Sequence, residues 1–240
     1  MQDWKQAFRL AMFELKASKG SFLALFLFFL LMLFFFKTVL DYDLDKKTGI
    51  FDIFVFYIFS SFMMLVVKRK GFQIAKINED VIASPSFVML SQLAIKKDTI
   101  IKSRFIIHFV YSFPFQLVFL ICLYPLTPGI QHALPVSSYI GLAVIWLSFS
   151  FYFGYGFPAS EAGIKGTVKA TILSYAMIMA GLLIIIFIPI LSGYSIFYWT
   201  IILSRNWPLA SSLVSIILAI LGVIYWMHYA RKSIEKFDYL

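Results

Sequence analysis

The sequence is poor in the residues that most enzymes use for chemistry. Its 240 residues include one cysteine and three histidines, against 28 phenylalanines. A single cysteine, Cys122, permits no internal disulfide. The histidines, His108, His132 and His228, are scattered along the chain. The composition therefore predicts neither a disulfide framework nor a metal centre.

Catalytic and nucleotide-binding motifs are also missing. The sequence contains no HExxH and no G-x-S-x-G. The nearest approach to a phosphate-binding loop is GIKGT at residues 163–167, which lacks the Gly-x-x-x-x-Gly-Lys-[Ser/Thr] spacing. We therefore predict that the chain is not an enzyme, holds no cofactor and does not hydrolyse nucleotide by itself.

Apolar residues dominate what remains. Hydrophobic residues make up 61% of the chain, and the mean hydropathy is +0.88. A helix needs about 20 apolar residues to cross a bilayer. Six stretches qualify, at about 21–40, 51–67, 105–126, 137–157, 170–191 and 207–229. The sequence predicts an all-α membrane protein with six transmembrane helices in a single domain, residues 1–240.

The distribution of lysine and arginine predicts the orientation of these spans. With the N-terminus inside, 17 of the 21 basic residues lie on the cytoplasmic side and four lie outside. Basic residues are enriched in cytoplasmic loops of membrane proteins. We therefore expect a multi-pass protein of the cell membrane with both termini cytoplasmic. Because the net charge of +9 flanks the spans in this way, it does not indicate nucleic-acid binding.

Residues 1–20 are expected to form an amphipathic helix that lies in the membrane interface. Trp4, Phe8, Ala11 and Leu15 are spaced as one face of a helix, with cations beside that face. The alternative is a polar tail that happens to be helical. At the opposite side, residues 192–206 are too short to span and too apolar for a solvated loop. They predict a short extracellular helix or re-entrant piece, unless the fifth span simply ends later.

Neutral polar side chains fall within several predicted spans. The candidates for a substrate path are Tyr111, Gln116, Ser148, Tyr152, Tyr155 and Tyr175. Such groups can line a route for a bulky amphipathic substrate, or they can serve helix packing. No Asp or Glu falls in the middle third of a predicted span, which disfavours an ion-coupled transporter.

The longest polar segment is Lys68–Arg104, with eight basic and three acidic residues. Its end, residues 93–105, resembles a segment of ABC-2 type transporter permeases that leads into the third span. The residues that match in character are Leu93, Ile95, Lys97, Ile100, Ile101, Ser103, Arg104 and Phe105. Ala94 and Lys96 stand where that family has proline and serine. The layout of spans, interfacial helix and basic inner loop is also similar.

The resemblance implies a permease subunit that dimerises and docks two ATPase subunits, which would supply ATP and Mg²⁺ chemistry. In that family, a cytoplasmic coupling helix between spans 2 and 3 contacts each ATPase, and 77–93 is the candidate here. The residues implied in coupling are Ile77, Glu79, Asp80, Val81, Ile82, Pro85, Ser86 and Phe87, with Glu161 and Lys165 in a second contact. The alternative for Glu161 is a solvated loop charge.

The function that the resemblance implies is ATP-driven export of an amphipathic or antimicrobial peptide, or of a hydrophobic compound. The second permease copy could be identical or different. Two other classes stay open: a substrate-binding membrane module, and a non-transporting immunity or scaffold protein. Copurification with an ATPase distinguishes the exporter from the scaffold.

Overall fold

The computed structural model describes residues 2–46, 50–60, 68–78 and 81–236, and they are mostly helical. Five stretches of helix are long and apolar enough to cross a membrane. They lie in α2 (Lys19–Lys46), α6 (Lys97–Leu126), the Val136–Ser160 segment, α10 (Val168–Ser192) and α12 (Pro208–Lys236). The prediction of a helical membrane protein is therefore confirmed in this form.

The predicted second span is described only in part. Helix α3 (Ile50–Phe59) covers residues 51–59 of it, and 61–67 lie outside the described residues. Asp52 in this helix is fully buried. A sixth crossing therefore stays a prediction, although α3 packs against α2, α8, α10 and α11.

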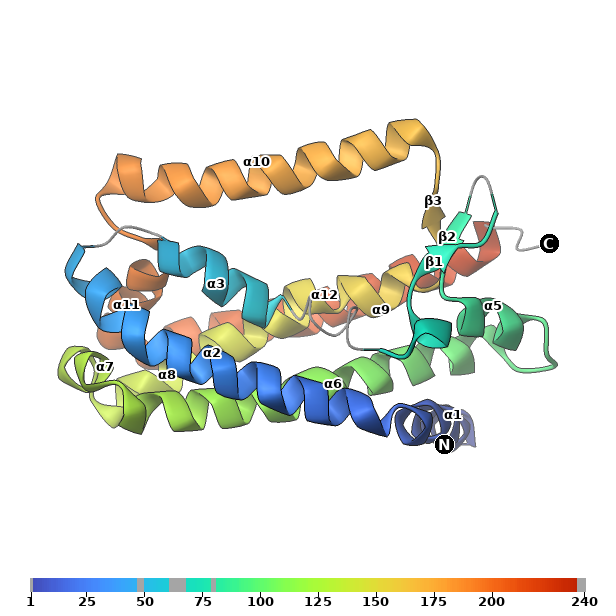
Figure 1. The fold of residues 1–240 in the computed structure, drawn as a ribbon, viewed down its shortest axis with the longest axis horizontal. Helices are drawn as coiled ribbons and strands as arrows, with labels where there is room; N and C mark the ends of the chain where they lie inside the picture. Colours follow the sequence, from blue (N-terminus) through green and yellow to red (C-terminus); the bar gives the residue numbers. More distant parts are fainter. Residues whose placement is uncertain (1, 47–49, 61–67, 79–80, 237–240) are drawn as a thin grey trace.

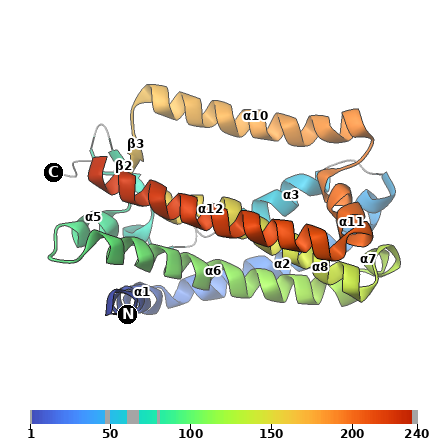
Figure 2. The same ribbon diagram turned by 180° about the vertical axis from the view of Figure 1, so that it is seen from behind.

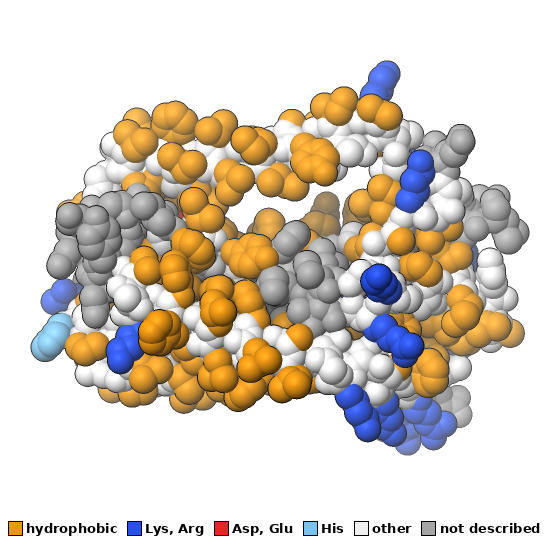
Figure 3. Space-filling view, in the orientation of Figure 1, with side chains coloured by type: hydrophobic (Ala, Val, Ile, Leu, Met, Phe, Trp, Pro, Cys, Tyr) orange, Lys and Arg blue, Asp and Glu red, His pale blue; other side chains and the backbone are white. Residues whose placement is uncertain are grey.

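The helices run roughly along one long axis, and the two ends of the bundle differ (Figure 1). One end carries α1 (Gln2–Ala17), α5 (Pro85–Ser91), a small sheet and the last turns of α12. Lysine and arginine side chains gather there, so we call it the basic end (Figure 3). The opposite end carries α7 (Pro128–Ala133) and α11 (Ile196–Asn206). The segments predicted to be inside and outside thus lie at opposite ends.

The sheet at the basic end was not anticipated from the sequence. Strands β1 (Ala75–Lys76), β2 (Val81–Ala83) and β3 (Ile164–Lys165) pair antiparallel in the order β1-β2-β3. Val81 lies opposite Lys165 in the register. A 3₁₀ turn, η1 (Lys70–Phe72), precedes the sheet, and α5 follows β2. The sheet joins the long polar loop to the segment between the predicted fourth and fifth spans.

Aromatic rings fill the core between α2, α3, α6, α8 (Val136–Phe149) and α11. The Phe36 ring lies 4.6 Å from that of Phe51 and 5.0 Å from that of Phe119. Phe51 in turn contacts the Phe197 ring of α11 at 4.8 Å. Lipid tails are as apolar as phenylalanine, so close packing rather than water exclusion must hold these helices together. Edge-to-face ring pairs add about 0.5–1.5 kcal/mol each to such packing.

A π-helical turn, η2 (Ser150–Gly154), interrupts the fourth spanning segment before α9 (Gly156–Ser160). There the segment interlocks with α12. A Cβ on Gly222 would lie 2.7 Å from Cδ2 of Tyr152, and one on Gly156 would lie 3.1 Å from the Trp226 ring. Trp226 Nε1 also donates a hydrogen bond of 2.7 Å to the Tyr152 carbonyl. Gly222 of α12 thus packs against the Tyr152 ring, and Gly156 packs against the Trp226 ring of α12. The Trp226 indole also gives a hydrogen-bond partner to the Tyr152 carbonyl at the π turn.

Replacing Gly222 with alanine is expected to destabilise the protein by about 1–3 kcal/mol, because the new methyl group must displace the backbone or ring of Tyr152. The measurement is unfolding by dodecyl sulfate in mixed micelles. Gly181→Ala in α10 is the matched control, since nothing lies within 4 Å of its added Cβ. An equal response of the two variants would contradict the interlock.

Helix α10 stands apart from the other spanning helices (Figures 1 and 2). No residue in the most apolar 18-residue stretch of α10 is buried. The helix contacts α3 and α11 near one of its ends. A hollow separates it from the rest of the molecule (Figure 3). It ends at Ser192, and Gly193 follows with a left-handed φ of 72°. Because α11 begins separately at Ile196, the alternative in which the fifth span simply continues is wrong.

Helix α11 is capped from a distant part of the chain. The two oxygens of the Asp52 carboxylate accept hydrogen bonds from the backbone N–H groups of Ile196 (2.6 Å) and Phe197 (2.8 Å). The local cap, Ser195 Oγ, accepts from the N–H of Tyr198 at 3.1 Å. A carboxylate is favourable at a helix N-terminus, where N–H groups lack partners within the helix. Asp52 therefore ties α3 to α11 at the end opposite the basic end.

Candidate functional site at the basic end

Helix α5 and the residues that follow it expose apolar side chains at the basic end. Met89 of α5 is 57% exposed, and Leu93, two residues after the end of the helix, is 53% exposed. The opposite face carries Phe87, which is 1% exposed, and Val88, which is also buried. Pro85 occupies the first turn, where a missing N–H costs nothing, and begins the helix. The seven-residue helix thus has one anchored face and one face that is open at the surface.

The anchored face of α5 joins several spanning helices. Phe87 packs in one cluster with Ile100 and Phe105 of α6, Ala159 of α9 and Ile234 of α12. Burying a phenylalanine side chain is worth roughly 1.5–3 kcal/mol. A displacement of α5 would therefore act on the ends of three membrane-spanning segments. These segments would either move with α5 or resist its movement. This geometry suits a short lever between a surface contact and the bundle.

The predicted coupling residues occupy different environments. Val81, Ser86 and Phe87 are buried within this chain, Ile77, Ile82 and Pro85 are half-buried, and Lys165 is exposed. Glu79 and Asp80 lie outside the described residues. Val81 and Phe87 are already buried by the chain itself, so these two side chains do not need a partner to cover them. Met89 and Leu93 are the side chains of this segment that offer exposed apolar surface.

Glu161 is not a solvated loop charge, and its carboxylate is not on the surface. It belongs to a cluster of four charges, with Glu14, Lys68 and Arg104, in which no residue is more than 5% exposed. Lys68 pairs closely with Glu161, and Arg104 pairs closely with Glu14. Each cation also reaches the other anion, at 3.8 Å from Lys68 to Glu14 and 3.6 Å from Arg104 to Glu161. The cluster is therefore balanced, with two charges of each sign.

The four charges come from four separate parts of the chain. They are contributed by α1, the start of the long polar loop, α6 and the turn after α9. Burial raises the pKa of the Glu14 carboxyl, and the charges of Arg104 and Lys68 oppose that rise. Buried charges are stable only when paired, so the cluster fixes how these four segments fit together. Ser84 adds a link, because its N–H donates to the Glu161 carbonyl at 3.2 Å.

Sequence reasoning missed the roles of Glu14 and Lys68. One signal was available: Ala7, Ala11 and Glu14 are spaced as one helical face, and all three are buried against the protein. An acid on the small-residue face of a basic helix is out of place unless it meets a cation. The same burial divides the predicted interfacial face, because Ala11 and Leu15 pack inward whereas Trp4 and Phe8 are half-exposed.

The predicted substrate-path residues do not converge on one route in this structure. Tyr111 stacks on Phe22 at 4.8 Å in the helical core, and the Gln116 amide donates to the Ile58 carbonyl at 3.3 Å. Tyr155 is also buried, at the basic end. Tyr152 and Tyr175 are exposed, on η2 and α10. The first three residues therefore have packing partners within the chain.

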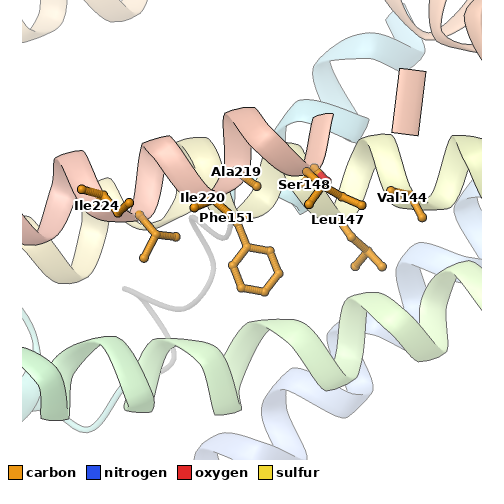
Figure 4. Close-up of a pocket in the computed structure, with 9 residues that line it drawn as sticks. Val144, Leu147, Ser148, Phe151, Ala219, Ile220 and Ile224 are labelled. Atoms are coloured by element: carbon orange, nitrogen blue, oxygen red, sulfur yellow. The ribbon is translucent and has the colours of Figure 1, made fainter. Parts of the chain in front are cut away.

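Ser148 lies in a groove of about 490 Å³ between α8, η2 and α12 (Figure 4). The side chains that line it are Val144, Leu147, Ser148, Phe151, Ile216, Ala219, Ile220, Val223 and Ile224. Among the described residues that line it, Ser148 is the only polar one. An apolar groove on spanning helices suits lipid tails or another apolar helix.

Comparison with protein-family models, curated proteins and solved structures gives no match for this chain. Among the described residues, no group of three or more His, Cys, Asp or Glu could hold a metal ion.

Proposed function

We propose that this chain is the permease subunit of an ATP-driven ABC exporter of the cell membrane. Two copies, identical or different, would pair and dock two ATPase subunits at the basic end, which would face the cytoplasm. The cargo would be an amphipathic or antimicrobial peptide or a hydrophobic compound. The observation that carries this proposal is α5, which is open toward a partner on one face and anchored to three spanning segments on the other.

The position of α5 supports this assignment. It lies between the two described chain ends, both of which are predicted to be cytoplasmic (Figure 1). The segment that resembles ABC-2 permeases follows it directly into α6. The sequence has no phosphate-binding loop, so energy for transport would have to enter through contact with another subunit. A rigid displacement of a packed element is a common way to convey such energy.

The refined contact surface consists of Met89 and Leu93. Both are apolar and more than half exposed, and the exposed Lys96 and Lys97 follow at the start of α6. This combination fits a partner cleft with an apolar floor and acidic rim. Val81 and Phe87 support the surface from behind, and Glu161 holds the adjoining loop through the charge cluster.

Replacing Met89 or Leu93 with aspartate is expected to release an ATPase partner, because a charge would enter an apolar contact. With the two residues changed together, we expect at least a tenfold loss of ATPase recovered with the purified permease, equivalent to about 1.4 kcal/mol. The measurements are copurification and substrate-stimulated ATP hydrolysis with the ATPase encoded nearest to this chain.

The control for this experiment is Val136→Asp, an exposed apolar position at the opposite end of the bundle. Insertion and yield of every variant should match those of the unchanged protein, since Met89 and Leu93 lie outside the spanning segments and Val136 is the first residue of one. Full ATPase recovery and coupling with both Met89 and Leu93 replaced would refute docking through α5. If no ATPase copurifies even with the unchanged chain, the immunity or scaffold class is favoured instead.

A further inference from the structure

A cavity of about 470 Å³ lies at the basic end, between the start of α10 and the end of α12. Its lining residues are Ile164, Lys165, Ala170, Leu173, Ser174, Tyr229, Lys232, Ser233 and Lys236. Three elements contribute: β3, the first turns of α10 and the last turns of α12. Neither the docking surface of α5 nor the buried charge cluster shares a side chain with it.

The cavity is strongly cationic. Lys165 enters from β3, and Lys232 and Lys236 lie one turn apart on α12. The described part of the lining contains no acidic residue, and within the described chain none of these three lysines forms an ion pair. Arg231, by contrast, is committed to Asp98 at 2.7 Å. Three lysines that line one cavity, with no acidic residue in its described lining, make the cavity suited to an anionic ligand.

Hydroxyl groups and a helix terminus add to this preference. Tyr229 and Ser233 line the same cavity and can donate hydrogen bonds to an anion, whereas the Ser174 hydroxyl donates to the Ala170 carbonyl at 2.9 Å. The N-terminal turn of α10, which begins at Val168, contributes the positive end of a helix dipole. These groups are of the kind that bind a phosphate ester.

The remaining wall is apolar, which narrows the class of ligand. Ile164, Ala170 and Leu173 line the cavity, and Leu173 is 61% exposed on α10. Beyond it, α10 continues as an apolar helix with no buried residue in its central window, across a hollow from the bundle (Figure 3). A cationic mouth that leads to an unfilled apolar space matches a molecule with an anionic head and apolar tails.

We propose that this cavity binds the headgroup of an anionic phospholipid, whose acyl chains extend between α10 and α12. The three lysines hold the phosphate, and the hydroxyls of Tyr229 and Ser233 orient it. Basic pockets between helices on the cytoplasmic side of a membrane are known to take such headgroups. This site is separate from the proposed docking of an ATPase, and it would tether the otherwise detached start of α10 to α12.

The test uses the full chain, purified in a mild detergent and analysed by native mass spectrometry with added phosphatidylglycerol or phosphatidylcholine of identical acyl chains. We expect phosphatidylglycerol to be retained preferentially. A lysine beside an anionic headgroup contributes on the order of a fivefold preference. The triple variant Lys165→Gln, Lys232→Gln, Lys236→Gln should therefore lose at least about tenfold of this preference.

The matched control removes three exposed cations of α1, by Lys5→Gln, Arg9→Gln and Lys16→Gln. It changes the net charge equally and should keep the preference. Glycerol 3-phosphate tests the head alone, and it should displace phosphatidylglycerol only at far higher concentration. Equal potency of the two would instead assign the cavity to soluble phosphate esters. An unchanged lipid preference in the cavity variant, or an equal loss of preference in the α1 control, would overturn the proposal. It would also be overturned if the cavity variant lost capture of the ATPase but kept its preference for phosphatidylglycerol.

Discussion

Replacing Arg104 with methionine is expected to lower the free energy of unfolding by about 3–5 kcal/mol. The guanidinium is 2% exposed and pairs with Glu14, while Glu161 lies 3.6 Å away. Removing it leaves two carboxylates and one ammonium group buried together. An unpaired buried charge is costly, because neither water nor a counter-ion stabilises it. The effect should appear in dodecyl sulfate titrations in mixed micelles.

The second variant of this series separates charge balance from packing. Adding Glu14→Gln to Arg104→Met restores neutrality and leaves the close pair of Lys68 and Glu161 in place. We expect the double variant to be more stable than Arg104→Met alone, although it has lost one more native side chain. If the double variant were less stable by the sum of the single effects, the charges would not act as a balanced cluster.

An exposed ion pair of the same region provides the control. Lys96 and Asp3 lie 3.1 Å apart, with side chains 74% and 40% exposed. Such pairs contribute about 0–1 kcal/mol, because water screens them and the side chains lose freedom. Lys96→Gln should therefore change stability little. The comparison isolates burial as the cause of the large effect, since both pairs join α1 to the region that leads into α6.

Replacing Asp52 with alanine is expected to lower the free energy of unfolding by about 3–6 kcal/mol. Its carboxylate accepts hydrogen bonds from the N–H groups of Ile196 and Phe197, and hydrogen bonds to a charged group contribute about 1.5–3 kcal/mol each. Without the carboxylate, the first turn of α11 loses both acceptors in a buried setting. Hydrogen exchange of the 196–206 amides should rise more than that of the α6 amides.

Two further substitutions define the size of this effect. Asp52→Asn keeps one good acceptor oxygen and should cost about half as much as the alanine variant. Ser195→Ala removes the local cap on Tyr198 and should cost about 1 kcal/mol. A response of Asp52→Ala no larger than that of Ser195→Ala, with unchanged exchange in α11, would show that the remote carboxylate does not hold this helix.

These two contacts lie at opposite ends of the bundle, and they hold segments that the chain connects only over long distances. The charge cluster joins α1 and the loop after α9, whereas Asp52 joins α3 and α11. If the proposed exporter changes shape during transport, these ends must move as fixed units or exchange partners. The cluster is suited to exchange, because each cation already lies within 4 Å of both anions.

The sequence by itself determined the class of protein and the locations of five spanning segments. Runs of about 20 apolar residues have few alternatives to a membrane helix, because each helix satisfies its backbone hydrogen bonds internally. The separation of basic from other loops is likewise a local property of the sequence. It predicted which segments share an end of the bundle, and the structure brings Lys68–Arg104, the start of α10 and both described chain ends together.

Only the tertiary structure decided which polar residues are buried and which apolar residues are exposed. Glu161 resembles a loop charge until Lys68, 93 positions away, meets it inside the protein. Phe87 resembles a partner contact until α6, α9 and α12 enclose it, which leaves Met89 and Leu93 outside. The physical reason is range: periodicity and composition act over a few turns, whereas burial depends on contacts between segments that the sequence does not order in space.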